Sequence, residues 1–228
     1  MKRTFRSMVN SRFASVLALM LSVALAASAK VKVTIDHNAR PEATASFKFK
    51  YVPSPAKEDA AATAKLSLVV GERDRNSADL SALTDGILPA DEDEPRSNFF
   101  FKAGDSGGRF LMDLGRAIAI KQVNSYSWHS DSRAPQIYNL YASDGADADF
   151  NPSPDAKTHP AGCGWKLIAT VDTTAQYGDD GGQYGVSIAD PDGSLGKFRY
   201  LLFEVIETEV DDPFGNTFFS EVDVIADK

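Results

Sequence analysis

Residues 109–127 read RFLMDLGRAIAIKQVNSYS, and residues 136–143 read QIYNLYAS. Both are short apolar runs without the sustained 3.6-residue apolar period of an amphipathic helix. Similar runs recur along the chain, and turn-forming pairs such as Gly107-Gly108 and Asp144-Gly145 separate them. Many short strands without alternating helices predict an all-β fold, an antiparallel β-sandwich or jelly roll.

Two stretches near the N-terminus alternate apolar and polar residues with the period of a strand. They are residues 31–35 and 47–51, so the sandwich is expected to carry extra N-terminal strands. Residues 54–64, rich in Pro and Ala, predict a loop or a short helix. The other expected strands are 66–70, 98–101, 109–114, 118–127, 136–143, 165–172, 185–188, 199–206 and 218–225.

The first 29 residues have the make-up of a secretory signal peptide. Four basic residues precede a 15-residue apolar run over 13–27, and Ala27-Ser28-Ala29 supplies small residues for cleavage. The alternative is a membrane anchor, but the run is shorter than the ~20 residues that a spanning helix needs. We therefore expect no membrane span, and a mature chain that begins at Lys30 and is secreted or periplasmic.

The charge balance and the single cysteine exclude several classes of partner and site. After residue 29 the chain holds 20 basic and 32 acidic residues, a balance of −12. That charge argues against nucleic acid and anionic lipid as partners. The single cysteine, Cys163, excludes an internal disulfide and a zinc site built on cysteines.

Six motifs occur in an order that resembles one known family. They are 83–86 (LTDG), 110–115 (FLMDLG), 135–145 (PQIYNLYASDG), 164–168 (GWKLI), 199–201 (RYL) and 220–224 (SEVDV). Together they resemble the discoidin domain, the C-type module of coagulation factors, within the galactose-binding-like superfamily. The resemblance assigns residues 64–228 to a discoidin-like domain, and residues 30–63 belong to no family that we can assign.

This resemblance implies a binding domain, because members of the family bind sugars, lipid head groups or proteins. The ligand of the sugar-binding members sits on loops at one end of the sandwich. The matching loop here, residues 128–134, offers Trp128 as a platform for a sugar ring and His129, Asp131 and Arg133 as polar contacts. The alternative is that Trp128 plugs the core and Arg133 pairs with a neighbouring acid.

A second loop, residues 211–217, matches another ligand-contacting loop of the family. Phe214 and Asn216 are its candidate contacts. The alternative for this loop is a tight turn with Phe214 packed inward.

The family also implies a structural calcium ion between the early Asp-Gly loop and a glutamate on the last strand. These positions match Asp85 and Glu221. Calcium needs six to eight oxygen ligands, which loop carbonyls help to supply. The sequence departs from the family at Ile87, where an acid or amide is usual, and this puts the ion in doubt.

Motifs of hydrolases, zinc proteases and phosphate-binding loops are absent from the sequence, so we expect no catalytic activity. Two functions follow. The first is an exported carbohydrate-binding module whose ligand is a carbohydrate or surface glycan. The alternative is a module for protein–protein contact or cell-surface assembly, which uses the same loops or the N-terminal strands to bind a partner. Residues 47–51, with Phe47, Phe49 and Tyr51 in alternation, are expected to form an edge strand open to pairing.

Overall fold

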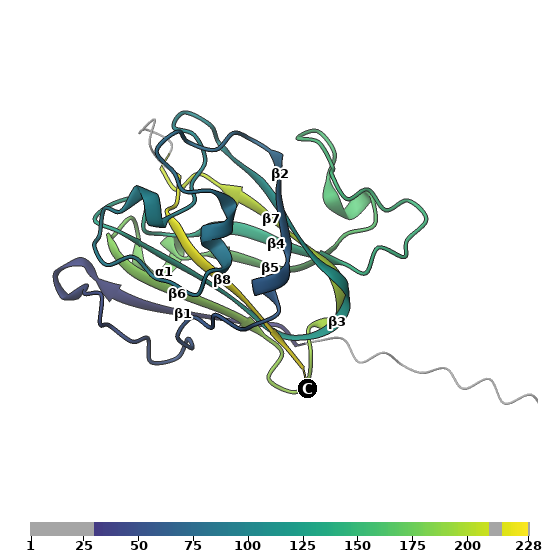
Figure 1. Cartoon of the computed structure of the whole chain (residues 1–228), viewed down its shortest axis with the longest axis horizontal. Coiled ribbons are helices and arrows are strands. Elements are labelled where there is room, and N and C mark those ends of the chain that lie inside the picture. The colour runs from purple at the N-terminus through teal and green to yellow at the C-terminus, as the bar shows by residue number, and fades with distance from the viewer. Residues whose placement is uncertain (1–29, 210–215, 228) are drawn as a thin grey trace, which may run out of the picture.

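Strands dominate the computed structural model, which describes residues 30–209 and 216–227 (Figure 1). The predicted signal peptide, residues 1–29, lies outside the described residues. Within those two ranges no helix is long and apolar enough to cross a membrane. The strands are β1 (Lys32–Ala39), β2 (Lys65–Val70), β3 (Gly107–His129), β4 (Ile137–Ser143), β5 (Lys166–Asp172), β6 (Gly182–Ala189), β7 (Gly196–Ile206) and β8 (Phe219–Ala226). The helices are short: α1 (Thr174–Tyr177) and the 3-10 turns η1 (Arg40–Glu42), η2 (Ala61–Thr63), η3 (Leu80–Thr84), η4 (Pro95–Ser97) and η5 (Pro160–Gly162).

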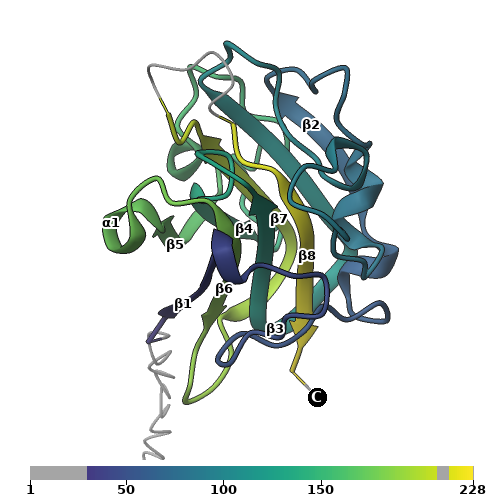
Figure 2. The same cartoon turned by 90° about the vertical axis from the view of Figure 1, so that its left-hand side faces the viewer.

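Strand β3 belongs to two sheets and joins them into one hydrogen-bonded network (Figure 2). The sequence predicts two strands, 109–114 and 118–127, where the structure has one strand of 23 residues. The register with β7 shifts between Asp113 and Ile118. Gly115 lies in this interval with a φ of 77°, a backbone conformation that a residue without a Cβ adopts at no steric cost. The strand therefore bends there without ending.

The pairings on either side of the bend define the two layers of the sandwich. Residues 107–113 of β3 lie between β2 and β7, and β7 continues to β4 and β5. Residues 120–129 of β3 lie between β8 and β6, and β6 continues to β1. All of these pairs are antiparallel, so the predicted β-sandwich is confirmed.

The core lies between the two layers and follows the two-residue period of the strands. Phe110 and Met112 are fully buried in the main apolar cluster, whereas Leu111 between them joins a second cluster on the other face of its sheet. Strand β8 shows the same alternation, because Val222 and Val224 enter the core while Asp223 between them does not. The core is therefore specified by alternation along individual strands.

The N-terminal segment is part of the sandwich. β1 confirms the predicted strand at 31–35 and extends the second sheet by pairing with β6 over residues 32–39. The stretch 47–51, in contrast, forms no strand, and that prediction is wrong. It crosses the outer face of the second sheet, where a Cβ on Gly185 of β6 would lie 3.2 Å from the Phe49 ring. This contact replaces pairing with a neighbouring strand.

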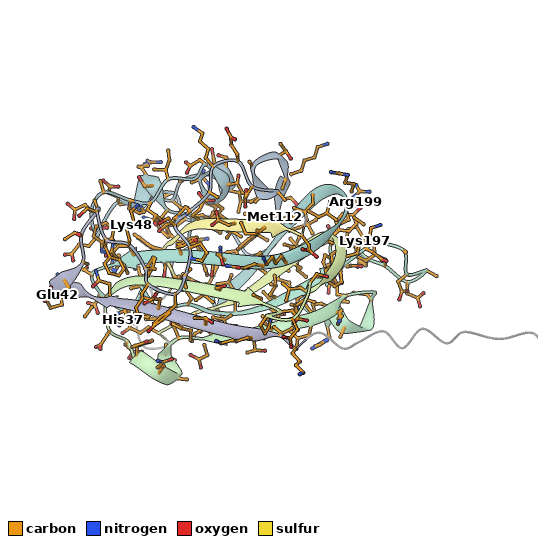
Figure 3. All side chains as sticks on the ribbon, turned by 90° about the horizontal axis from the view of Figure 1, so that it is seen from below. His37, Glu42, Lys48, Met112, Lys197 and Arg199 are labelled. Carbon is orange, nitrogen blue, oxygen red and sulfur yellow. The ribbon has the colours of Figure 1, made fainter. Side chains whose placement is uncertain are left out.

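Polar side chains of the second sheet hold this covering segment by its backbone. The Gln183 amide exchanges two hydrogen bonds with the backbone of Thr44, at 3.2 and 2.8 Å. The Tyr126 hydroxyl donates to the carbonyl of Pro53 at 2.6 Å. Figure 3 labels Lys48 on this segment and His37 on β1. Residues 44–53 are thus fastened over the sheet at both ends.

Candidate functional site

A hollow of about 230 Å³ opens at the end of the sandwich where β3 ends and β4 begins. Loop segments far apart in the sequence meet there, and buried polar side chains hold them together. The Ser77 hydroxyl accepts a hydrogen bond from the backbone N–H of Phe100 at 3.0 Å. The Asn98 amide donates to the carbonyl of Glu94 at 2.8 Å and accepts from the Ser220 hydroxyl at 2.8 Å. These bonds fix the loops that line the hollow.

Aromatic rings form the inner wall of the hollow. Phe100 and Phe218 line it and stack at 4.1 Å with their planes 18° apart, and both are almost fully buried. The guanidinium group of Arg133 lies 5.1 Å above the Phe218 ring. A cation over an aromatic face is attracted by the ring quadrupole, so this contact orients Arg133 at the hollow.

Polar groups of four residues surround this apolar wall: Asp74, Asn76, Asp93 and Arg133. Asp74 is held in a turn, since one of its carboxylate oxygens accepts from the backbone N–H of Asn76 at 2.8 Å. Carboxylates accept hydrogen bonds, a guanidinium group donates them and an amide does both. Such a set around an apolar wall suits a ligand with apolar faces and several hydroxyls.

The predicted loop at 128–134 contributes one residue to the lining and supports it with another. Arg133 lines the hollow. His129 packs edge-on against Phe218 with ring centroids 4.7 Å apart, and its Nδ1 accepts from the backbone N–H of Asp131 at 3.0 Å. Burial lowers the pKa of His129, and the nearby positive charge of Arg133 adds to this effect. The imidazole is therefore neutral at pH 7, with its proton on Nε2. The Asp131 side chain is exposed in the adjoining turn.

Trp128 lies away from this hollow. It is still within β3, 5% exposed, on the face that the N-terminal segment covers. Its ring borders a void of only about 10 Å³, which Phe47, Phe49 and Pro89 also line. Its Nε1 has no hydrogen-bond partner in the described part of the chain. This arrangement leaves no free indole face for a sugar, and the platform role predicted for Trp128 has no geometry to support it here.

The second predicted loop is described only in part. Phe214 lies outside the described residues. Asn216 is 2% exposed, and its amide nitrogen donates to the carbonyls of Lys102 and Asp105, at 3.3 and 2.9 Å. Asn216 therefore fixes the turn that follows Phe101. In this position it holds in place the loop that carries the lining residues Phe101 and Ala103.

The candidate calcium ligands have other partners. The two carboxylate oxygens of Glu221 accept from the backbone N–H groups of Gly86 (2.7 Å) and Val222 (3.2 Å), and Asp85 accepts from that of Ile87. Burial raises the pKa of Glu221 to about 8, and the charges of Asp223 and Asp85 act in the same direction. A calcium ion is bound by oxygen atoms. The backbone around Glu221 instead presents N–H groups to its carboxylate.

The described residues contain no group of three acidic, histidine or cysteine side chains that could hold a metal ion. The proposed calcium site remains a prediction that needs a binding measurement.

The sequence interpretation missed most residues that line the hollow: Asp74, Asn76, Asp93, Phe100 and Phe218. One signal was available, because 98–101 contains three consecutive phenylalanines. A strand with apolar residues on both faces has to be covered on both. The structure has only isolated bridges there, at Phe99 and Phe101, so Phe100 is left to face the loops.

Comparison with known proteins found similarity only among solved structures. No family model and no curated protein matches the chain. A mutant of the lectin-binding domain of lectinolysin, complexed with Lewis b, is 13% identical with a TM-score of 0.49, over 76% of this chain and 99% of that one. The fucose-binding module SpX-3 of Streptococcus pneumoniae is 14% identical with a TM-score of 0.47, over 75% and 99%.

A third similar structure is the CBM32-5 module from Clostridium perfringens in complex with GalNAc-β-1,3-galactose. It is 14% identical with a TM-score of 0.46, over 73% of this chain and 98% of that one.

Proposed function

We propose that the protein is a non-catalytic carbohydrate-binding module and that the hollow between Phe100, Phe218 and Arg133 holds a sugar ring. The observation that supports this is a stacked aromatic wall with carboxylate, amide and guanidinium groups around it. A sugar ring has apolar C–H faces and a belt of hydroxyls, and this set of side chains complements both. The volume of about 230 Å³ suits one ring at a time.

The test is a glycan array followed by titration calorimetry with the glycan that binds best. We expect a dissociation constant of about 0.01–1 mM, which corresponds to roughly 4–7 kcal/mol. Arg133→Ala or Asn76→Ala is expected to weaken binding at least ~10-fold, because each removes polar groups that border the hollow.

The matched control is Lys197→Ala, which also removes one positive charge. Lys197 is exposed on β7, and Figure 3 shows it at the end of the molecule opposite Glu42. Its glycan affinity is expected to stay within about twofold of the parent. Equal affinities in the Arg133→Ala and parent proteins would place the ligand elsewhere. Release of new reducing ends from the bound glycan would show that the module is catalytic.

Export is the second part of the proposal, and it rests on the sequence of residues 1–29. Cleavage after Ala29 is expected to leave Lys30 as the first residue of the mature protein. N-terminal sequencing of the protein from the periplasm or the medium checks this. Recovery of the chain with Met1 intact in a membrane fraction would show an anchor instead.

A further inference from the structure

Two more hollows continue from the one proposed to bind sugar. All three follow a short ribbon in which residues 72–74 pair with residues 100–102, through the Arg73–Phe101 bridge and a 2.8 Å bond from the N–H of Lys102 to the carbonyl of Glu72. The middle hollow, about 460 Å³, shares Asp74, Asn76 and Ala103 with the first. The third, about 830 Å³, shares Glu72 with the middle one. The three hollows therefore adjoin one another along the loop end of the sandwich, and together they are called the groove.

A groove of three successive hollows fits an extended ligand better than a single sugar ring. The third hollow is floored largely by backbone, because Gly71, Gly104, Gly107 and Gly108 all border it. At Gly104 the space beside the Cα is open, so a ligand can approach the main chain there, whereas the missing Cβ of Gly71, Gly107 and Gly108 faces other protein atoms. A linear oligosaccharide would place one unit in each hollow.

The middle hollow is the part of the groove where basic side chains outnumber acidic ones. Arg73, Arg75 and Lys102 line it together with Glu72 and Asp74. Lys102 pairs with Glu72 at 2.9 Å, and Arg73 pairs with Asp79 at 3.3 Å.

The other two charged side chains of the middle hollow, Asp74 and Arg75, differ in their hydrogen-bond and ion-pair partners. The Asp74 carboxylate is occupied, since its oxygens accept from the backbone N–H groups of Asn76 and Ala103. Arg75 is exposed, and it has neither an ion pair nor a hydrogen bond within residues 30–209 and 216–227. Its guanidinium group is thus available to an anionic ligand.

In the first and third hollows, acidic side chains outnumber basic ones. The first carries Asp74 and Asp93 against Arg133. The third carries Glu72, Asp105 and Glu204 against Arg109, whose guanidinium group already pairs with Glu204. The whole chain also has a formal net charge of −8. A ligand with a charge on every unit would therefore meet like charges at both ends of the groove.

We infer that the groove binds a linear oligosaccharide in which one unit carries a single carboxylate or sulfate group, held by Arg75, between neutral units. This inference rests on the proposed function and adds the charge pattern of the ligand. A planar guanidinium group binds carboxylate and sulfate oxygens through paired N–H donors, and its exposure makes the contribution modest and salt-dependent. We expect a preference of about fivefold over the neutral ligand at low salt.

The experiment is an array that carries each oligosaccharide in four forms: neutral, with one internal uronic acid, with one internal sulfate ester, and uronic at every unit. The parent protein is expected to bind a singly acidic form about fivefold more tightly than its neutral counterpart, and the fully uronic form no more tightly than the neutral one. The two singly acidic arms distinguish carboxylate from sulfate. Arg75→Gln is expected to bind the singly acidic and neutral forms equally, and high salt is expected to have the same effect.

Arg96→Gln is the matched control, because Arg96 is also exposed, in η4 next to the lining residue Pro95, but lines none of the three hollows. It should keep the preference. Neutral and singly acidic forms that bind the parent equally, with binding still lost in Arg133→Ala, would overturn this inference and leave the proposed function standing. Strongest binding to the fully uronic forms would also overturn it. A parent protein that binds no glycan in any form would refute both.

Discussion

Replacing Trp128 by alanine is expected to lower the free energy of unfolding by about 3–5 kcal/mol. The side chain is 5% exposed, between the second sheet and the N-terminal segment that covers it. Its removal leaves a cavity that fixed neighbours cannot fill, because residues 44–53 are hydrogen-bonded to Gln183 and Tyr126. Urea unfolding of the parent and the variant measures the loss.

Tyr51→Ala is the control for this experiment. Tyr51 is an aromatic residue of the same covering segment but is 64% exposed, so its removal is expected to change stability by no more than about 0.5 kcal/mol. Parent-like unfolding of Trp128→Ala together with lost glycan binding would contradict the packing role. That result would support the role in ligand binding that the sequence predicts for Trp128.

The second large effect concerns Glu221. Burial raises its pKa in the folded protein to about 8, from an ordinary value of 4.5. Between these values the folded protein holds a proton that the unfolded chain has released, so stability falls as the pH rises through this window. One such group contributes at most about 1.4 kcal/mol per pH unit. From pH 6 to pH 8 we expect Glu221 alone to account for a loss of about 2–3 kcal/mol of unfolding free energy.

Two neighbouring carboxylates titrate in the same direction. Burial raises the pKa of Asp59 to about 6 and also raises that of Asp223. Asp59 is about half protonated at pH 6, so it adds roughly 0.4 kcal/mol to the loss between pH 6 and 8, and Asp223 adds to the same slope. Burial lowers the pKa of His37 and of His129, so the titration of these two histidines opposes the slope. Chemical unfolding at several pH values, with a chelator present, gives that slope.

Glu221→Gln should remove most of the fall in stability that Glu221 causes in that interval, so the slope that remains is due to Asp59, Asp223, His37 and His129. The glutamine side chain cannot accept hydrogen bonds from the N–H groups of both Gly86 and Val222, so the variant is less stable than the parent by about 1 kcal/mol at every pH. The comparison therefore uses the change of unfolding free energy with pH and not its absolute value. The same measurement tests the calcium prediction. If added calcium stabilises the parent above pH 7, but not Glu221→Gln, then the ion binds and the N–H groups now facing Glu221 must turn away.

Some features of this protein follow from local sequence. The alternation of Phe110, Leu111 and Met112 fixes which side chains enter the core, because successive residues of a strand point to opposite faces. The two-residue period is a property of each strand alone, and it was sufficient to predict the β-sandwich and most of its strands. The order of the sequence motifs also pointed to Asp85, Gly86 and Arg133. The structure places these residues in loops.

Other features depend on long-range contacts, which a linear pattern does not contain. The stretch 47–51 alternates like a strand, but β1 already occupies the edge of β6, so the stretch packs across the sheet and buries Trp128. Phe100 and Phe218 are 118 positions apart and become one aromatic wall only when the chain has closed. By itself the sequence determined the strands and the inward-facing core residues. Tertiary structure decided which aromatic residues border a hollow that a ligand could enter, because that depends on where distant segments pack.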